Sequence, residues 1–213
     1  MTTFTFKQFI ESLASQYAPG PSTTFKTSHI FYALDLMSEK PIGRNKLAKQ
    51  LTVGEGAVRT IISRLKQAGL IETTKEGCSL TAKGQQVWKT FTENFPTRVE
   101  IGKNELVKTD YSYAFLVKNS GHKIGSGIEQ RDAAVVAGAQ KAVVIVCKND
   151  RLAIDSVTDN LKSQFPLSAS QILRHMHPEN NDVIIIAGAG SLQRAKHGAF
   201  AASWVLLNGY HAA

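Results

Sequence analysis

Hydrophobic positions recur with the period of an α-helix in the first half of the chain. Between about residues 55 and 68, the apolar side chains fall at i, i+3, i+4 and i+7: Val58, Ile61, Ile62 and Leu65. This spacing places them in one stripe and predicts an amphipathic helix. A shorter helix is predicted from about 43 to 50, followed by a break at 52–54, where Gly54 can adopt a positive φ. Two helices joined by such a break predict a helix-turn-helix.

The pattern changes from helical to extended after Gly69, a residue type that often ends helices. The segment 70–80 predicts two short strands around a turn at residues 73–77. Another helix is predicted from Thr81 to about Phe95, and Pro96 ends it because proline cannot continue a helix.

The stretch AVRTIISRLKQAGLIETTKEGCSLTAKGQQVW contains this helix, the strand pair and the start of the next helix. It resembles the winged-helix family of prokaryotic transcription regulators, and the resemblance covers roughly residues 28–92. The resemblance implies an α+β winged helix-turn-helix domain over residues 1–96, with the second helix in the major groove of double-stranded DNA. The residues expected to contact DNA are Arg44, Lys46, Glu55, Arg59, Thr60, Ser63, Arg64 and Lys75.

An amphipathic helix is also predicted near the start of the chain, over about residues 4–17, with Phe4 and Tyr17 on its apolar side. The segment Pro19-Gly20-Pro21 closes it. The winged-helix core is expected to begin with the helix near Ser28, so the earlier helix is an addition. It either serves a dimer interface or covers the core of its own domain, and the sequence leaves both possibilities open.

Positive charge concentrates on the predicted helix-turn-helix. Seven basic residues lie between Lys40 and Lys66, against the single acid Glu55, in a chain whose formal net charge is +8. Neutralisation of phosphates supplies much of the affinity of proteins for DNA, so this distribution favours nucleic-acid binding. A solvated basic face without a partner is the alternative.

The second half of the chain alternates β-branched runs with helical segments. The clearest runs are 142–147 and 183–187, and shorter strands are predicted at 113–117 and 152–154. Helices are predicted between and after them, over about 129–139, 157–165, 168–175 and 191–207. Continuous apolar strands indicate a sheet covered on both faces. We therefore expect an α/β domain with a mixed or partly parallel sheet over residues 111–213, joined to the first domain by a linker at 97–110.

Two segments of this domain share the pattern G-small-G-x-x-Q-R, from Gly125 to Arg131 and from Gly188 to Arg194. Each precedes a predicted helix, whose N-terminal N–H groups and dipole favour anions. The expected ligand-binding residues are Gly125, Gly127, Gln130, Arg131, Gly188, Gly190, Ser191 and Arg194. If both helices begin at one sheet edge, the two arginines line a common cleft. Chance similarity in a chain rich in Gly and Ala is the alternative.

The segments SGIEQRDAAVVAGA and DVIIIAGAGS resemble an archaeal domain of unknown function found behind winged helices, over roughly residues 110–207. This resemblance implies an architecture but no chemistry. No arrangement of residues indicates a catalytic site, a metal site or a cofactor, and the two cysteines, Cys78 and Cys147, lack metal-ligand spacing. We also recognise no signal peptide and no apolar run long enough to span a membrane.

These observations favour a cytoplasmic, homodimeric, DNA-binding transcriptional regulator whose C-terminal domain senses a small anionic molecule. Two alternatives remain from the sequence. One is an enzyme, a small-molecule kinase or transferase that carries its own winged helix. The other is a winged helix used for protein contacts or for coating DNA without sequence preference.

Overall fold

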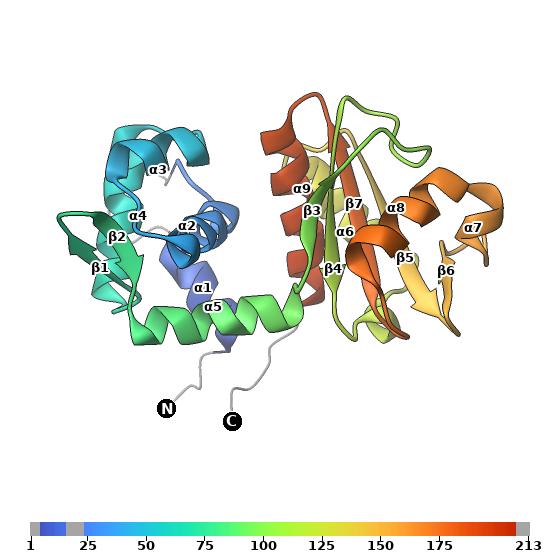
Figure 1. Cartoon of the computed structure of the whole chain (residues 1–213), viewed down its shortest axis with the longest axis horizontal. Coiled ribbons are helices and arrows are strands. Elements are labelled where there is room, and N and C mark those ends of the chain that lie inside the picture. Colours follow the sequence, from blue (N-terminus) through green and yellow to red (C-terminus); the bar gives the residue numbers. More distant parts are fainter. Residues whose placement is uncertain (1–4, 16–23, 208–213) are drawn as a thin grey trace. The chain divides into compact units, whose positions relative to one another are not determined.

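The chain folds into two compact units that divide between Phe91 and Thr92 (Figure 1). The computed structural model describes residues 5–15 and 24–207. Phe4, Tyr17 and the segment Pro19-Gly20-Pro21, which entered the prediction of the first helix, lie outside the described residues.

The first unit is a helical domain with a small antiparallel sheet. Its elements are α1 (Phe6–Ala14), α2 (Thr27–Glu39), α3 (Arg44–Leu51), α4 (Glu55–Gln67), β1 (Ile71–Thr74) and β2 (Gly77–Leu80). Helix α5 (Ala82–Asn94) follows β2 and carries the chain into the second unit. Strand β1 pairs antiparallel with β2, and Ile42 forms a further bridge to Cys78 of β2. This arrangement confirms the predicted winged helix-turn-helix.

The apolar stripe of α4 forms part of the core of the first unit. Val58, Ile61 and Leu65 are fully buried, whereas Ile62 is only half-buried. A cluster of aromatic rings lies in the same unit, with Phe31 packed edge-on against Phe91 at 5.0 Å between ring centroids. The stripe therefore fixes the orientation of α4 and leaves the opposite side of this helix to solvent.

The turn between α3 and α4 differs from the prediction in one respect. Thr52 has the left-handed conformation, with φ 57°, whereas Gly54 is extended with φ −64° and caps the N-terminus of α4. The helix ends one residue later than expected, so the left-handed residue that commonly ends a helix is Thr52. Gly69, after α4, has φ 72°, as expected for a residue that ends a helix.

The second unit contains a five-stranded sheet with the order β3-β4-β7-β5-β6. Its strands are β3 (Arg98–Ile101), β4 (Tyr111–Val117), β5 (Lys141–Lys148), β6 (Arg151–Ala153) and β7 (Val183–Ala189). Its helices are the short 3₁₀ helix η1 (Gly121–Lys123), α6 (Ile128–Val136), α7 (Leu161–Gln164), α8 (Pro166–Met176) and α9 (Leu192–Leu206).

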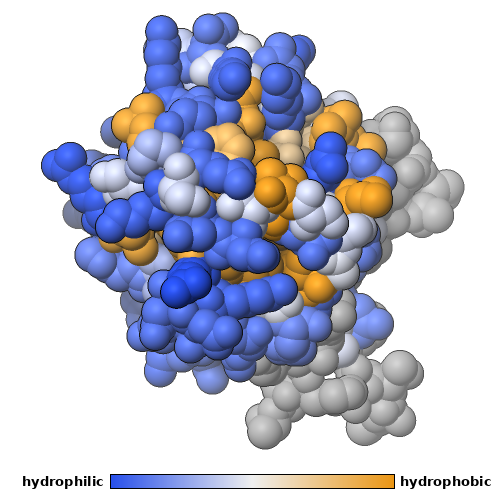
Figure 2. Space-filling model, turned by 90° about the vertical axis from the view of Figure 1, so that its right-hand side faces the viewer, coloured by the Kyte–Doolittle hydropathy of each residue, from blue (hydrophilic) through white to orange (hydrophobic). Residues whose placement is uncertain are grey.

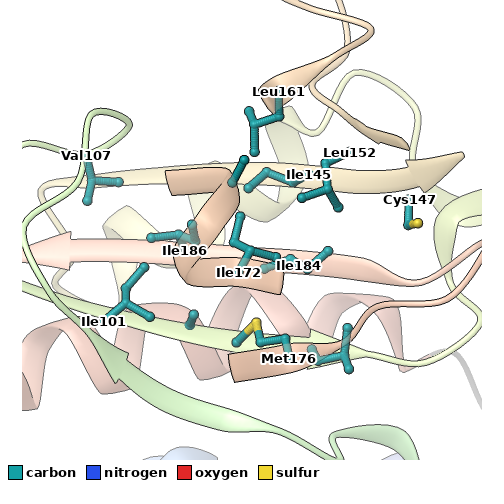
Figure 3. Packing of buried hydrophobic residues seen from close by; sticks show 13 residues of the cluster. Ile101, Val107, Ile145, Cys147, Leu152, Leu161, Ile172, Met176, Ile184 and Ile186 are labelled. Atoms are coloured by element: carbon teal, nitrogen blue, oxygen red, sulfur yellow. The ribbon is translucent and has the colours of Figure 1, made fainter. Parts of the chain in front are cut away.

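Helices cover both faces of this sheet, as the continuous apolar strands indicated. Helices α6 and α9 pack on one face, and α7 and α8 cover the other (Figure 1). Figure 3 shows Ile172 and Met176 of α8 facing Ile184 and Ile186 of β7 in the apolar cluster beneath α8. The strands and helices around this sheet confirm the expected class of the second domain.

Three details of the second domain are corrected. Every strand pair within the described residues is antiparallel. Strands β4 and β5 run in the same direction, but β7 lies between them, so they do not pair. The segment 97–110, expected as a linker, contains β3, which pairs with β4 along the whole of 98–101. A four-residue strand at the end of a sheet leaves too weak a pattern to predict. The helix expected over 157–165 is also shorter, since α7 begins at Leu161.

Candidate nucleic-acid interface and C-terminal cavity

The outer side of α4 presents polar side chains to solvent. Arg59 and Ser63 are exposed, and Arg59 lies 3.6 Å from Glu55, one turn earlier on the helix. Both partners are largely exposed, and ion pairs of this kind contribute little to stability. Arg59 can therefore leave Glu55 and bind a phosphate or a base with little loss of stability. The negative charge of Glu55, by contrast, is repelled by DNA phosphates. The hydroxyl of Thr60, half-buried, donates to the Gly56 carbonyl at 3.1 Å.

Arg64 has a different role from the one its sequence position indicates. Its Nη1 donates to the carbonyl oxygens of Leu13 at 2.9 Å and Ser15 at 2.6 Å. Its guanidinium also lies over the ring of Phe25, 5.2 Å from the centroid. These contacts tie α4 to the C-terminal end of α1, where carbonyls lack partners within the helix. The assignment of Arg64 to DNA contact is therefore corrected to a structural contact.

Helix α3 and the wing, which is the hairpin of β1 and β2, carry the other residues that were expected to contact DNA. Arg44, Lys46 and Lys75 are all exposed, and Arg44 and Lys46 line a shallow groove together with Thr73 and Thr74 of β1. Gly77 fixes the wing against the residues before α3. A Cβ there would lie 2.6 Å from the carbonyl carbon of Ile42, and its φ of 131° suits only glycine.

Three exposed residues beside this surface were not among the predicted contacts: Asn45, Lys49 and Lys66. Asn45 and Lys49 line a second depression, which α3 shares with Thr52, Val53 and Glu55 at the helix-turn-helix. Their signal was present in the sequence, because Lys49 and Lys66 belong to the basic cluster.

The second unit contains a cavity of about 450 Å³ beside α6 and β5. Its polar lining includes Ser126, Arg131, Gln140 and Lys141. Its apolar lining comes from both faces of the sheet and from the neighbouring loops: Leu106, Ile124, Val135, Ala142, Val143, Val144, Val146, Ile154 and Val157. Two acids, Asp132 and Asp155, also border it. The cavity can therefore hold a mainly apolar group with charged groups at its margin.

The first glycine-rich segment contributes to this cavity in part. Gly127 lines it and has φ 72° as the residue before α6, and Arg131 lies on the exposed side of the first turns of α6. Gly125 is exposed, with no atom within 4 Å of an added Cβ. Gln130, by contrast, is 3% exposed and does not line the cavity. The ligand-binding assignment of Gln130 is therefore corrected to a buried position.

The second glycine-rich segment lies at the other end of α6. Gly188 belongs to strand β7, and a Cβ there would collide with the hydroxyl of Thr109. The side chain of Ser191 caps α9 by accepting from the Arg194 amide at 3.4 Å. The Arg194 side chain lies against Gly138, since a Cβ added to Gly138 would be 3.6 Å from its Cγ.

These contacts separate the two helix N-termini. Gly138 follows the C-terminal end of α6, and a nine-residue helix spans roughly 13 Å. Helix α6 ends just before β5 starts, whereas α9 begins just after β7 ends. Because β5 and β7 are antiparallel, the C-terminal end of α6 and the N-terminal end of α9 lie at the same end of the sheet. The two helices therefore begin at opposite ends of the sheet. The expectation of a common cleft for Arg131 and Arg194 is therefore wrong. Gly190 approaches the cavity only indirectly, with an added Cβ 3.7 Å from the Gln140 side-chain nitrogen.

A carboxylate caps helix α8 and holds the loop before β4. The Glu105 oxygens accept from the backbone N–H groups of Leu167 at 3.3 Å and Ser168 at 2.9 Å, and from the Ser168 hydroxyl at 2.8 Å. Burial alone would raise the pKa of Glu105, but the three hydrogen bonds together lower it below its usual value. The amides of Leu167 and Ser168 in the first turn of α8 are therefore bound by a side chain of the protein itself.

A second carboxylate is buried where β4 ends. Asp182 is 1% exposed and accepts from Nζ of Lys118 at 2.9 Å and from the Asn119 amide at 2.9 Å. Lys118 also pairs with Glu179 at 2.6 Å. Burial opposes the charged form of Lys118, yet the two carboxylates raise its pKa above the usual value. This cluster joins the C-terminal end of β4 to the N-terminal end of β7.

In residues 5–15 and 24–207, no group of three or more His, Cys, Asp and Glu side chains is placed to hold a metal ion. No helix among them is long and apolar enough to cross a membrane.

Comparisons with known proteins agree with the two-part architecture. Residues 28–95 match the family model of the CggR N-terminal DNA binding domain, and residues 108–206 match a domain of unknown function, DUF4443. A solved structure, the hypothetical protein PH0730 from Pyrococcus horikoshii OT3, has a TM-score of 0.71 and 24% sequence identity over 85% of this chain and 92% of that chain. At this identity the likeness concerns the fold. No curated protein matches the chain.

Both resemblances found in the sequence, the winged helix and the following domain of unknown function, are confirmed by these matches. A DNA-binding domain of this type indicates a transcriptional regulator.

Proposed function

We propose that this chain, with a DNA-binding domain of the CggR type at its N-terminal end, regulates transcription by binding double-stranded DNA through α4. The observation that carries the proposal is the exposed polar side of α4, flanked by basic residues of α3 and the wing. In a winged helix this helix enters the major groove, and side chains of the neighbouring elements contact phosphates. A DNA partner also implies a location in the cytoplasm or nucleoid.

The proposed contacts fall into two groups. Arg59 and Ser63 on α4, with Thr60 between them, face the bases or the adjacent phosphates. Arg44, Lys46 and Lys75 reach the backbone on either side, together with the exposed Lys49. Arg64 is not part of this surface, because its guanidinium is held by α1.

Selection of DNA fragments from a random library, followed by sequencing, tests this proposal. We expect enrichment of a defined motif, and loss of that enrichment for Arg59→Ala. The matched control is Arg151→Ala, which removes an exposed arginine from the second unit. Binding without any enriched motif would favour the DNA-coating alternative, and absence of binding to any fragment would refute the proposal.

We further propose that the C-terminal unit senses a small molecule in the cavity beside α6. Arg131 and Lys141 at its margin would bind an anionic group, while Val144 and the neighbouring apolar side chains would contact a hydrophobic part. A ligand regulates DNA binding only if its affinity differs between two states of the protein. The expected ligand is therefore a small organic acid or phosphate ester with an apolar portion.

Native mass spectrometry of the purified full-length chain against a library of such acids and esters tests the sensing proposal. Arg131→Ala should lower the affinity of a bound compound at least tenfold, whereas Arg194→Ala should not, because Arg194 lies at the other end of α6. Equal effects of the two substitutions would place the ligand elsewhere. Conversion of a bound compound into a product would instead favour the enzyme alternative.

A homodimer is also part of the proposal. Regulators of this class commonly read two half-sites with two copies of the DNA-binding domain, so that the symmetry of the site matches that of the protein.

A further inference from the structure

Strand β5 has an open edge along its first five residues. Strand β6 pairs only with Val146, Cys147 and Lys148 of β5, and among the described residues no strand pairs with 141–145 on that side. An unpaired edge presents N–H and C=O groups that can bind another strand.

The direction of these groups follows from the alternation along the strand. The Cys147 amide donates to Asp182 at 2.9 Å, at the end of β7, so the odd-numbered residues of β5 direct their backbone groups toward β7. Ala142 and Val144 therefore direct theirs toward the open side. Their two N–H donors and two C=O acceptors therefore point to the side that borders the cavity and is occupied by no strand of the described residues.

Exposed apolar side chains lie beside this edge. Helix α6, which packs against β5, exposes Ile128 by 57%, Val135 by 53% and Val136 by 81%, and Val157 in the loop after β6 is 57% exposed. Figure 2 views the molecule from the side on which Figure 1 shows β5 and β6, and apolar patches interrupt the hydrophilic surface there. Exposed apolar side chains beside an unpaired strand are typical of a protein interface.

The charges beside the edge are balanced. Arg131 and Lys141 border the cavity along the edge together with the acids Asp132 and Asp155. A two-fold interface brings each surface patch onto a copy of itself, so a patch with equal numbers of cations and acids can form complementary pairs. A uniformly basic or acidic patch would instead repel its copy.

We propose that the open edge of β5 is the interface between two copies of this chain, with β5 pairing antiparallel to β5 of the second copy about a two-fold axis at Val143. The five open residues are symmetric about Val143. In this register Ala142 of each copy lies opposite Val144 of the other, and they exchange four backbone hydrogen bonds. The two sheets become one, and the two α6 helices bury Val135 and Val136 between them.

This inference rests on the proposed dimeric regulator and adds the surface through which it assembles. Because Ala142, Val143 and Val144 of this edge also line the cavity, the incoming strand would occupy part of it. A ligand in the cavity would therefore compete with dimer formation.

Sedimentation equilibrium of the full chain without DNA is the first test. We expect a dimer, and we expect the double substitution of Val135→Glu and Val136→Glu to raise its dissociation constant at least tenfold. Leu173→Glu is the matched control, since it adds a charge at an exposed apolar position of α8, which packs on the opposite face of the sheet. A monomeric wild-type chain, or a dimer that the double substitution leaves intact, would refute the proposal.

Cross-linking is the second test and reports the register. Residues directly opposite each other at a non-hydrogen-bonded position of an antiparallel pair lie about 4.5 Å apart at Cα, within the range of a disulfide. Val143→Cys should therefore form a covalent dimer on oxidation, whereas Leu173→Cys should not. The native cysteines are both buried. A soluble, folded Val143→Cys chain that remains monomeric would exclude this register, and a chain that fails to fold leaves the decision to the sedimentation test.

The two proposals can fail separately. A monomeric wild-type chain that still selects a DNA motif would refute the interface alone, whereas a β5-dependent dimer without DNA binding would refute the regulator alone.

Discussion

Arg64 on α4 donates a hydrogen bond of 2.6 Å to the carbonyl oxygen of Ser15, which follows the last residue of α1. The contact joins two segments that are 49 residues apart in the sequence. It assigns the half-buried Arg64 to a contact within the domain and leaves Arg59 as the exposed arginine of α4.

We predict that Arg64→Ala destabilises the first unit by roughly 1–3 kcal/mol, because it removes a charged donor from the part-buried carbonyl of Leu13 and from the exposed carbonyl of Ser15. The chain has two tryptophans, so urea unfolding in a Trp204→Phe background lets Trp88 report on this unit alone. Lys66→Ala, an exposed change on the same helix, should stay within about 0.5 kcal/mol of the parent. Equal stabilities of the two variants would show that the Arg64 contacts carry no net energy.

Arg59→Ala should weaken DNA binding while changing the free energy of unfolding by less than about 0.5 kcal/mol, because its ion pair with Glu55 is exposed. Loss of a phosphate contact would reduce the slope of affinity against salt by about one unit, and loss of a base contact would cost about 1–3 kcal/mol on the specific site. Titrations at several salt concentrations separate these cases. An effect below twofold would remove Arg59 from the interface.

Glu105→Gln should destabilise the second unit by roughly 1 kcal/mol at neutral pH, because an amide caps the N-terminus of α8 less well than a carboxylate. The lowered pKa of Glu105 means that its contribution is full above the ordinary carboxyl pKa and disappears as the pH falls through the folded-state pKa. The difference from wild type should therefore shrink as the pH falls below the ordinary carboxyl pKa.

Unfolding of a Trp88→Phe chain, in which Trp204 reports on the second unit, measures this dependence. The control is Glu129→Gln, an exposed change on α6. A difference for Glu105→Gln that stays constant with pH would mean that the charge of the carboxylate is irrelevant to the cap.

The fourth prediction concerns the boundary between the units. A chain that begins at Thr92 should fold alone, because it retains β3 and its pairing with β4. A chain that begins at residue 103 exposes the edge of β4 and should be less stable or aggregate. Circular dichroism and gel filtration of the two fragments provide the comparison. Equal behaviour of the two fragments would show that β3 is dispensable for the second unit.

The sequence by itself determined the elements whose signals are local. The period of Val58, Ile61 and Leu65 places α4 and its buried side, and the β-branched run at 183–187 identifies the central strand β7. Helical and extended backbones repeat side-chain directions over a few residues, so these patterns are readable without knowledge of the fold.

Only the tertiary structure decided which segments meet. The direction of β7 between β4 and β5 separates Arg131 from Arg194, although their flanking sequences are alike. Likewise, the two carbonyls that hold Arg64 come from a helix far away in the sequence. Such contacts depend on strand order and on the packing of distant helices, which the spacing of residues along one segment does not encode.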